Sequence, residues 1–343
     1  MEDDLNQHPN KLNNNLCINC GNPHIVEGYP NKLCADCRNK FIKFPVPLWV
    51  KLFGTGIVLV MLVSAVWLPG NLKAAIAISR AEKAEDESNY LNEQKELEKA
   101  KSIVPGSIDV LSHLVISSYY NEDYKVLDSA ADEIGSTEIS DSSLYNKVSN
   151  ILVHYKEFFP ADSFNVYIEK YKKTTIPDTV YQDYLKKNPQ DIFSIYSLAN
   201  SYDDQGKYSL ADSLISECLS IDPDFLPALN FKTSIKRSLN QIDSSIYYCN
   251  KIIEINHQSV YALSSKARTF LKIGKKQQAL LLAKKGYDLD PSVGYNLATL
   301  ALAYHLNNDF KKRDEIINLS KRDSSNASYM QYAKDVIANK EKL

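Results

Sequence analysis

The chain contains little glycine, methionine or tryptophan, with 11, 3 and 2 residues in a length of 343. So few glycines disfavour an architecture of strands and tight turns, whereas the 22 tyrosines favour packed helices. An excess of charge is also absent, since 40 Lys and Arg face 42 Asp and Glu. This balance gives no electrostatic reason to expect nucleic acid as a partner. The length exceeds one simple core and predicts two or three units.

The short motifs of catalysis are absent as well. The sequence has no H-E-x-x-H, no Gly-rich phosphate loop, no G-x-S-x-G and no carboxylate pair in a recognisable context, and its six histidines are scattered. We therefore expect neither enzyme activity nor a small-molecule substrate. The stretch 1–16 is polar, rich in asparagine and without an apolar period, which predicts a disordered N-terminus.

One apolar run stands out near the N-terminus. The stretch from Leu52 to Leu68 carries no charge, and a helix of that length covers about 25 Å of a bilayer core about 30 Å thick. Trp49 and Trp67 stand at its two ends, as in an aromatic belt, and Lys51 can extend to the headgroups. The run predicts a single transmembrane helix over residues 48–69.

Two other interpretations of this run fit less well. A buried soluble helix would not be apolar on every face, and a cleaved signal peptide would not follow a long segment that includes a cysteine cluster. The basic residues near the run set its expected orientation. On its N-terminal side they are Arg38, Lys40, Lys43 and Lys51, and on its C-terminal side Lys73 and Arg80, which Glu82 follows. We expect a cytosolic N-terminus and an extracytoplasmic C-terminal part.

Four of the six cysteines form two Cys-x-x-Cys pairs in one short segment, with the spacing Cys17-x2-Cys20-x13-Cys34-x2-Cys37. Each pair supplies two thiolates from one turn, and Gly21 follows the first pair, where such a turn needs a positive φ. The motif resembles a zinc ribbon over residues 17–43. It predicts a closed four-cysteine site for one structural zinc ion, because so short a segment needs a metal to fold.

Two alternatives to zinc remain open for this motif, and a third is excluded. Two disulfides require an oxidising compartment, which the expected orientation does not provide. A rubredoxin-like iron site uses the same ligands. Thioredoxin-like chemistry needs one pair on a strand-to-helix turn, which is absent, and His24 has no place in a site that four cysteines fill.

Self-similarity at a fixed interval dominates the C-terminal part of the chain. The stretch from Ile195 reads Ile-x2-Leu-Ala-x2-Tyr, and Gly206, Ala211-x3-Ile215 and Pro223 follow it. This pattern resembles the tetratricopeptide repeat (TPR), a helix–turn–helix unit of about 34 residues. The resemblance implies an all-α solenoid whose inner groove binds proteins or peptides.

Several kinds of position recur at this interval. The turn between the two helices of a repeat falls at Gly206, Asn240, Gly274 and Asn308. Small residues, where helices pack closely, are Ala199, Thr233, Ala267 and Ala301 on the first helices and Ala211, Ser245 and Ala279 on the second helices. The residues that end each repeat are Pro223, His257 and Pro291. They predict four repeats over residues 192–325, starting near Ile192, Leu226, Val260 and Gly294, and then a capping helix over 326–343.

Two repeats depart from the pattern. The second has Lys232, Thr233 and Lys236 where the first has Leu198, Ala199 and Tyr202, so its first helix packs more polar groups. The fourth has Arg313 in a small-residue column, which predicts a loosened helix pair or a bent side chain.

A degenerate form of the repeat precedes these four, over residues 74–191. Tyr90 and Tyr124 lie one repeat length apart and Pro105 occupies an exit position, which predicts two weaker repeats over 74–106 and 107–140. The stretch 181–191 resembles a second helix with an exit proline, but the phase slips by roughly half a repeat after 140. One helix in this region is therefore extra, and its packing is not predicted.

The resemblance assigns the inward positions of the first helices to a partner-binding groove. They are Tyr196, Asn200, Asp203, Asn230, Ser234, Arg237, Tyr261, Ser264, Arg268 and Tyr295. Tyrosine and arginine dominate interface energetics, although packing between neighbouring helices explains each tyrosine equally well. The basic pattern that clamps a C-terminal carboxylate in some TPR proteins is missing, because Tyr196 stands where lysine would be needed.

Cys218 and Cys249 lie on second helices of adjacent repeats. A disulfide between them is conceivable outside the cytoplasm, but their positions favour free buried thiols. The whole pattern indicates a membrane-anchored scaffold or adaptor that binds a protein or peptide in the TPR groove. The alternative is a membrane-bound regulatory component that uses the cysteine module as a metal or redox sensor.

Overall fold

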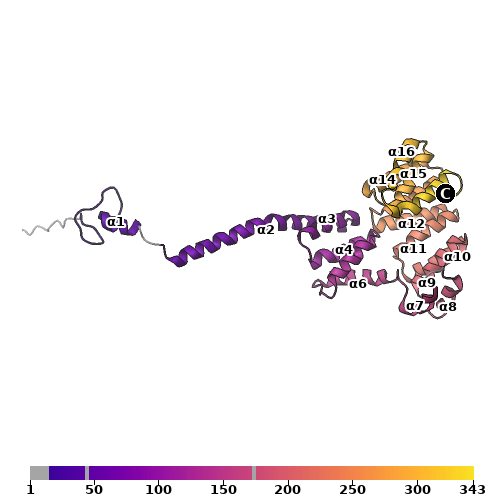
Figure 1. The fold of residues 1–343 in the computed structure, drawn as a ribbon, viewed down its shortest axis with the longest axis horizontal. Helices are drawn as coiled ribbons and strands as arrows, with labels where there is room; N and C mark the ends of the chain where they lie inside the picture. The colour runs from indigo at the N-terminus through magenta and orange to yellow at the C-terminus, as the bar shows by residue number, and fades with distance from the viewer. Residues whose placement is uncertain (1–14, 43–45, 172–174) are drawn as a thin grey trace, which may run out of the picture. The chain divides into compact units, whose positions relative to one another are not determined.

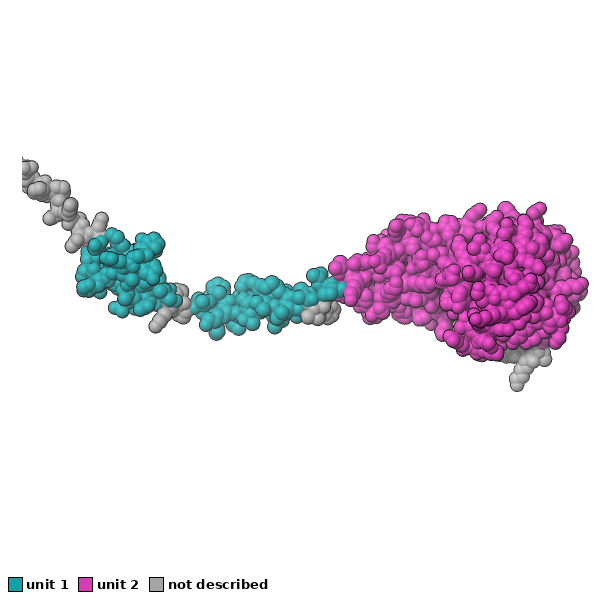
Figure 2. All heavy atoms as spheres, turned by 90° about the horizontal axis from the view of Figure 1, so that it is seen from above, with its two compact units in different colours: residues 1–69 teal, residues 70–343 magenta. Residues whose placement is uncertain are grey.

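A computed structural model describes residues 15–42, 46–171 and 175–343. The chain divides into two compact units, Met1–Pro69 and Gly70–Leu343 (Figure 2). All regular secondary structure in the described ranges is helical (Figure 1), which confirms the all-α prediction. Most of the N-terminal segment that the sequence predicts to be disordered lies outside these ranges.

The first unit contains the cysteine loop, the short helix α1 (Ala35–Ile42) and the first part of α2 (Leu48–Asp86). By length and composition, α2 is long and apolar enough to cross a membrane, and none of its most apolar 18-residue window is buried. The full exposure of this window does not fit a buried soluble helix. Trp49 is 70% exposed, whereas the side chain of Trp67 and all of Lys43 lie outside the described part of the chain.

The second unit begins with the end of α2 and four further helices, α3 (Tyr90–Ile103), α4 (Ile108–Tyr120), α5 (Tyr124–Ile134) and α6 (Ser142–Lys156). Ala74, Ala77, Ala81 and Ala84 recur every three or four residues and form one buried face of α2. Ala77 and Ala81 share a hydrophobic core with α3, α4, α5 and α6. The two N-terminal hairpins turn at Ser88 (φ 52°) and Glu122 (φ 60°), which stand one repeat length apart.

The region between residues 141 and 191, where the phase of the repeat slips, contains α6 and two short helices. α7 (Asp162–Ile168) leads through the 3₁₀ turn η1 (Glu169–Tyr171) towards α8 (Asp178–Leu185). α6 packs on α4, whereas Phe164, Tyr181 and Tyr184 form an aromatic cluster with Leu198 of the first repeat. α6 thus belongs with the N-terminal hairpins, whereas α7 and α8 pack on the repeat array. These additional helices explain why the repeat loses its phase in this region.

Four helical hairpins follow. Their first helices are α9 (Ile192–Asp204), α11 (Leu226–Ser238), α13 (Val260–Lys272) and α15 (Gly294–Leu306), and their second helices are α10 (Tyr208–Ile221), α12 (Ile242–Ile255), α14 (Lys276–Leu289) and α16 (Phe310–Ser320). The first helices begin at the four positions that the repeat interval predicts. The array ends with η2 (Ser324–Asn326) and α17 (Ala327–Ile337) (Figure 1).

The repeating positions have the geometry that their residue types require. Gly206, Asn240, Gly274 and Asn308 adopt φ of 70°, 59°, 76° and 62°, the left-handed region that glycine and asparagine tolerate. The seven small close-packing residues are all fully buried. Cys218 and Cys249 are free and buried, as expected. Arg313 bends along the surface, with Nη2 2.8 Å from Asp314 Oδ1 and Nη1 3.2 Å from His305 Nδ1.

The N-terminal hairpins do not simply extend the array. Repeats in a linear solenoid contact only their neighbours, yet here the His257 amide donates to the Ser88 carbonyl at 3.0 Å and the Asn92 amide to Gln258 Oε1 at 2.9 Å. Leu226 and Ile252 join the core of α2–α6. The N-terminal hairpins of the second unit thus lie beside the exit loops of later repeats, and a pocket forms there.

Candidate functional site

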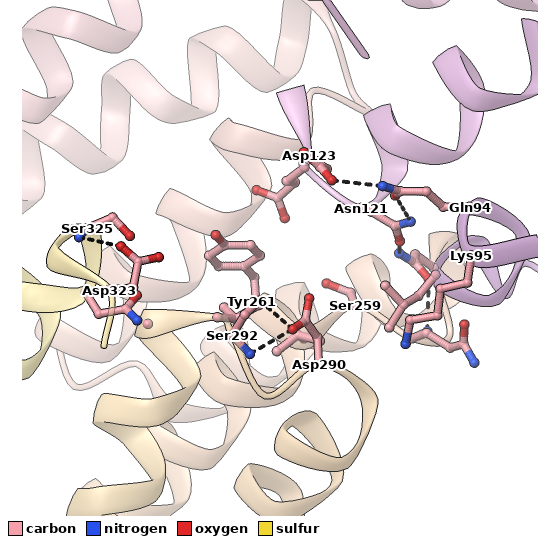
Figure 3. A pocket seen from close by; sticks show the side chains of 18 of the residues that line it. Gln94, Lys95, Asn121, Asp123, Ser259, Tyr261, Asp290, Ser292, Asp323 and Ser325 are labelled. Atoms are coloured by element: carbon pink, nitrogen blue, oxygen red, sulfur yellow. Dashed lines mark hydrogen bonds between the residues drawn. The ribbon is translucent and has the colours of Figure 1, made fainter. Parts of the chain in front are cut away.

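The loop pocket is a cavity of about 640 Å³ in the second unit, where segments far apart in the sequence meet. It is lined by α3, by the turn between α4 and α5, and by the loops that precede α13, α15 and α17 (Figure 3). The repeat interval explains why the loops before α13, α15 and α17 lie together in this lining, because each repeat presents its exit loop at the same edge of the array. The N-terminal hairpins close the pocket from the other side.

Acidic side chains outnumber basic ones in the lining of the loop pocket. Five acidic residues line it, and its one basic residue is Lys95; the acids are Glu98, Glu122, Asp123, Asp290 and Asp323. The Lys95 ammonium group is already engaged, since it donates to the Leu289 carbonyl at 2.9 Å. The pocket therefore favours a positively charged occupant.

A chain of amide hydrogen bonds fixes one wall of the pocket. Asn256 Nδ2 donates to Asn121 Oδ1 at 3.1 Å, Asn121 Nδ2 to Gln94 Oε1 at 2.8 Å, and Gln94 Nε2 to Asp123 Oδ2 at 2.8 Å (Figure 3). Asn256 is fully buried and Gln94 is 6% exposed. Because every donor in this chain has a defined acceptor, the wall holds the Asp123 carboxylate in place.

The exit loops supply two of the carboxylates through the same local turn. The Ser292 amide donates to Asp290 Oδ1 at 2.8 Å, and the Ser325 amide donates to Asp323 Oδ1 at 2.9 Å. An aspartate that accepts from the backbone two residues later forms an Asx turn. The repeat thus places a fixed carboxylate at each of these two exits.

Glu122 occupies the left-handed turn position of the α4–α5 hairpin, where the four later hairpins have glycine or asparagine. Such a conformation costs a glutamate about 1 kcal/mol. Its Oε1 accepts from Asn230 Nδ2 at 2.8 Å, and burial raises the pKa of Glu122 to about 7 although the Asn230 amide opposes this. Strained residues cluster at functional sites. Sequence analysis missed Glu122, although its place one repeat length after Ser88 was a usable signal.

Three tyrosines form a ladder that extends from the pocket along helices of the predicted groove. Tyr261, Tyr295 and Tyr329 recur at the repeat interval on α13, α15 and α17, every second helix of the array. The rings of Tyr261 and Tyr295 stack at 6.1 Å, and Tyr329 meets Tyr295 edge-on at 5.8 Å. Tyr261 and Tyr329 also line the loop pocket. The ladder joins the pocket to the predicted groove.

Two predicted groove residues, Arg237 and Arg268, are buried next to this ladder. The Arg268 guanidinium lies 3.9 Å from the centre of the Tyr295 ring and donates from Nε to Thr299 Oγ1 at 2.8 Å. Arg237 donates to Ser234 Oγ at 3.0 Å. No carboxylate in the described part of the chain forms an ion pair with either guanidinium. Burial acts to raise the pKa of Tyr295, but the charges of Arg268 and Arg237 lower it below its usual value.

The other predicted groove residues take different places. Ser264 is fully buried and donates to Asn296 Oδ1 at 2.7 Å, so it packs between α13 and α15. Asn230 is held by Glu122. On α9, Tyr196 packs edge-on against Phe231, Asn200 donates to the Tyr196 carbonyl, and burial raises the pKa of Asp203. These α9 residues do not line the loop pocket.

The four cysteines of the first unit lie together. One sulfur from each of Cys17, Cys20, Cys34 and Cys37 falls within 4.8 Å of the other three. The sulfurs of Cys20 and Cys34 are 3.6 Å apart. This distance is close to the separation of about 3.8 Å between sulfurs around a tetrahedral zinc ion with Zn–S bonds of about 2.3 Å. It is much longer than a disulfide bond of about 2.05 Å. The arrangement fits a single metal ion.

Backbone and side-chain donors surround these sulfurs. The Cys37 amide donates to Cys34 Sγ at 3.4 Å and Asn19 Nδ2 to Cys37 Sγ at 3.3 Å. Gly21 has φ of +74°, as the first turn requires. The second pair lies at the start of α1, which begins directly after Cys34 and contains Cys37, and no strand forms within residues 15–42.

No protein-family profile and no curated protein matches the chain. Solved structures that resemble it include MamA, with 17% sequence identity, coverage of 47% of this chain and 89% of that chain, and a TM-score of 0.34. Another is YrrB, described as a TPR protein with an unusual peptide-binding site, with 15% identity, coverage of 61% of this chain and 97% of that chain, and a TM-score of 0.33. A tetratricopeptide repeat protein from Parabacteroides merdae also resembles it, with 13% identity, coverage of 77% of this chain and 99% of that chain, and a TM-score of 0.40. These low identities and scores say nothing of what the chain binds.

Proposed function

We propose that this protein is a membrane-anchored scaffold that binds a protein partner along the groove, with a lysine or arginine of the partner in the loop pocket. The five acidic residues that line the pocket, against Lys95 as the one basic residue in its described lining, carry this proposal. Tyr261 and Tyr329 support it, because both line the pocket and tyrosine rings supply contact area and attract cations. The occupant is a basic segment of a protein.

The same proposal assigns α2 as the anchor and the four cysteines as a structural zinc site. The length and exposed apolar surface of α2 support the first assignment, and the crowded free thiols support the second. In this arrangement the cysteine module faces the cytosol and the array faces the other side. The excess of basic residues on the N-terminal side of the apolar run supports that orientation.

Fluorescence anisotropy with the full chain in detergent micelles tests the binding. The probes are a lysine-rich peptide and an acidic peptide of equal length. We expect the basic peptide to bind and the acidic one not to bind. The double variant Asp290→Asn with Asp323→Asn should weaken binding at least tenfold, while asparagine preserves both exit turns. Binding should also weaken as salt increases.

The matched control is Asp243→Asn with Glu254→Gln, which removes two exposed carboxylates from α12 outside the pocket. It changes the net charge by the same amount, so it separates the pocket from general attraction. Equal loss of affinity in both double variants would assign binding to overall charge. Absence of binding to the basic peptide would refute the proposed occupant.

A further inference from the structure

A second cluster of ionisable side chains lies in the N-terminal hairpins, outside the loop pocket and far in sequence from the cysteines. Glu85 comes from the end of α2, Glu93 from α3 and His113 from α4. One donor atom of each lies within 4.8 Å of the other two. His113 Nδ1 is 2.9 Å from Glu85 Oε2 and 3.7 Å from Glu93 Oε1.

Glu93 is the unusual member of this cluster. It is fully buried, and neither of its carboxylate oxygens has a hydrogen-bond partner. Burying a carboxylate without hydrogen bonds is costly, so such a group takes up a proton, pairs with a cation or binds a metal. The nearest partner is His113 Nδ1, beyond hydrogen-bond distance. The carboxylate points into the cluster with its bonding capacity unused.

We propose that Glu85, Glu93 and His113 bind a divalent transition-metal ion through two carboxylate oxygens and the imidazole Nδ1. Nitrogen and oxygen donors around such an ion at about 2.1 Å lie about 3.0–3.4 Å apart, close to the 2.9 and 3.7 Å separations from His113. Two carboxylates offset the double positive charge of the ion, and the imidazole binds it in its neutral form. This donor set suits zinc, manganese or iron.

A lysine and a cavity lie beside the three ligands. Lys147 Nζ contacts Glu85 Oε1 at 2.8 Å, which leaves Oε2 facing His113. Glu85 and Lys147 also line a cavity of about 310 Å³ together with Tyr90 and Tyr120. Three protein ligands leave at least one coordination position open, and the cavity beside Glu85 gives water a place near the ion.

Manganese distinguishes this site from the four cysteines, because carboxylate ligands suit Mn²⁺ and thiolates favour zinc. The full chain in detergent micelles is titrated with Mn²⁺, and the EPR signal of the free ion measures binding. We expect one bound Mn²⁺ per chain. Glu93→Gln and His113→Gln should each weaken binding more than tenfold. Cys34→Ser should leave it unchanged.

Glu96→Gln is the matched control, since Glu96 lies three residues after Glu93 on α3 and pairs with Lys99 at the surface. It should bind Mn²⁺ like the wild type. Pulsed EPR of the bound ion in the wild-type chain needs no variant to fold, and it should show coupling to an imidazole nitrogen. No bound ion, no nitrogen coupling, or full binding by a folded Glu93→Gln chain would each overturn the proposal.

Discussion

Lys232 Nζ lies 2.8 Å from Asp212 Oδ1, and this ion pair joins α11 to α10 inside the repeat array. Lys232 is only 2% exposed and also donates to the Asp212 carbonyl at 2.7 Å and to Ser216 Oγ. Lys236 binds the other oxygen of the same carboxylate at 2.8 Å. In the first repeat the position of Lys232 is held by the buried Leu198. The second repeat has thus replaced an apolar contact with a compensated charge.

Asp212→Asn should destabilise the second unit by about 2–4 kcal/mol, because it leaves a buried ammonium group without its counter-charge. Urea unfolding followed by circular dichroism measures this change. The double variant Lys232→Met with Asp212→Leu should unfold close to the wild type, since it removes both charges. A loss below about 0.5 kcal/mol in Asp212→Asn would show that solvent already screens this pair.

Gly294 begins α15 at a point of close approach to the C-terminal helices. A Cβ at this position would lie 2.1 Å from Asn326 Oδ1 and 2.8 Å from Asn326 Cγ, and Asn326 is buried. Gly294→Ala should therefore cost about 2–3 kcal/mol through overpacking. The measurement is the urea midpoint of the full chain in detergent.

Gly274→Ala is the control for this substitution. A Cβ at Gly274 meets nothing within 4 Å, and its φ of +76° is the only obstacle, so the expected loss is about 1 kcal/mol. Adding Asn326→Ala should recover much of the loss in Gly294→Ala and none of that in Gly274→Ala. Equal recovery, or none, would remove the steric explanation.

Glu122 should make stability depend on pH. Burial raises the pKa of Glu122 from 4.5 to about 7, so the folded state binds the proton more tightly than the unfolded state. The stability contributed by this proton is complete below about pH 4.5 and is lost as the pH rises through about 7. Glu122→Gln should therefore stabilise the chain more at pH 8 than at pH 5, by about 1–2 kcal/mol.

Urea unfolding at the two pH values measures that difference. Since other groups titrate in the same range, the informative quantity is the variant minus the wild type at each pH. The exposed Glu138 supplies a control, and Glu138→Gln should shift stability equally at both values. A Glu122→Gln effect that does not change with pH would show that Glu122 is ionised in the folded chain.

The sequence was a good guide to the array because each feature there is local. Gly206 and Asn240 mark left-handed turns, and Ala199 and Ala211 mark close helix contacts, since the repeat interval carries both chemistry and geometry. It was a poorer guide to the side-chain environment of a single position. Ser264 has the spacing of a groove residue, but the neighbouring Asn296 draws it into the helix interface.

The loop pocket and the Glu85–Glu93–His113 cluster escaped prediction for another reason. Both depend on the N-terminal hairpins packing beside distant exit loops or on one another, as in the bond between Asn92 and Gln258. No periodic pattern encodes a contact across such a separation. The six histidines looked scattered because only the fold brings His113 to two glutamates.

The proposed orientation predicts that a protease added outside intact cells or sealed spheroplasts cleaves the array. Its preferred site should be the exposed loop between α5 and α6, around Ser136–Glu138, because exposed loop tips are cut first. The four cysteines would then lie on the reducing side and remain free to bind zinc. Lysed cells serve as the control for cleavage, and a cytosolic marker protein confirms that the cells stay sealed.

Protection of the array in sealed cells, with cleavage after lysis, would reverse the orientation. The cysteine loop would then face the oxidising side, where two disulfides compete with zinc. Alkylation of the denatured chain with and without reductant decides between them, since Cys218 and Cys249 are buried thiols that react in both samples. Four additional alkylated thiols after reduction would refute the zinc assignment, whereas equal labelling would retain it on either side of the membrane.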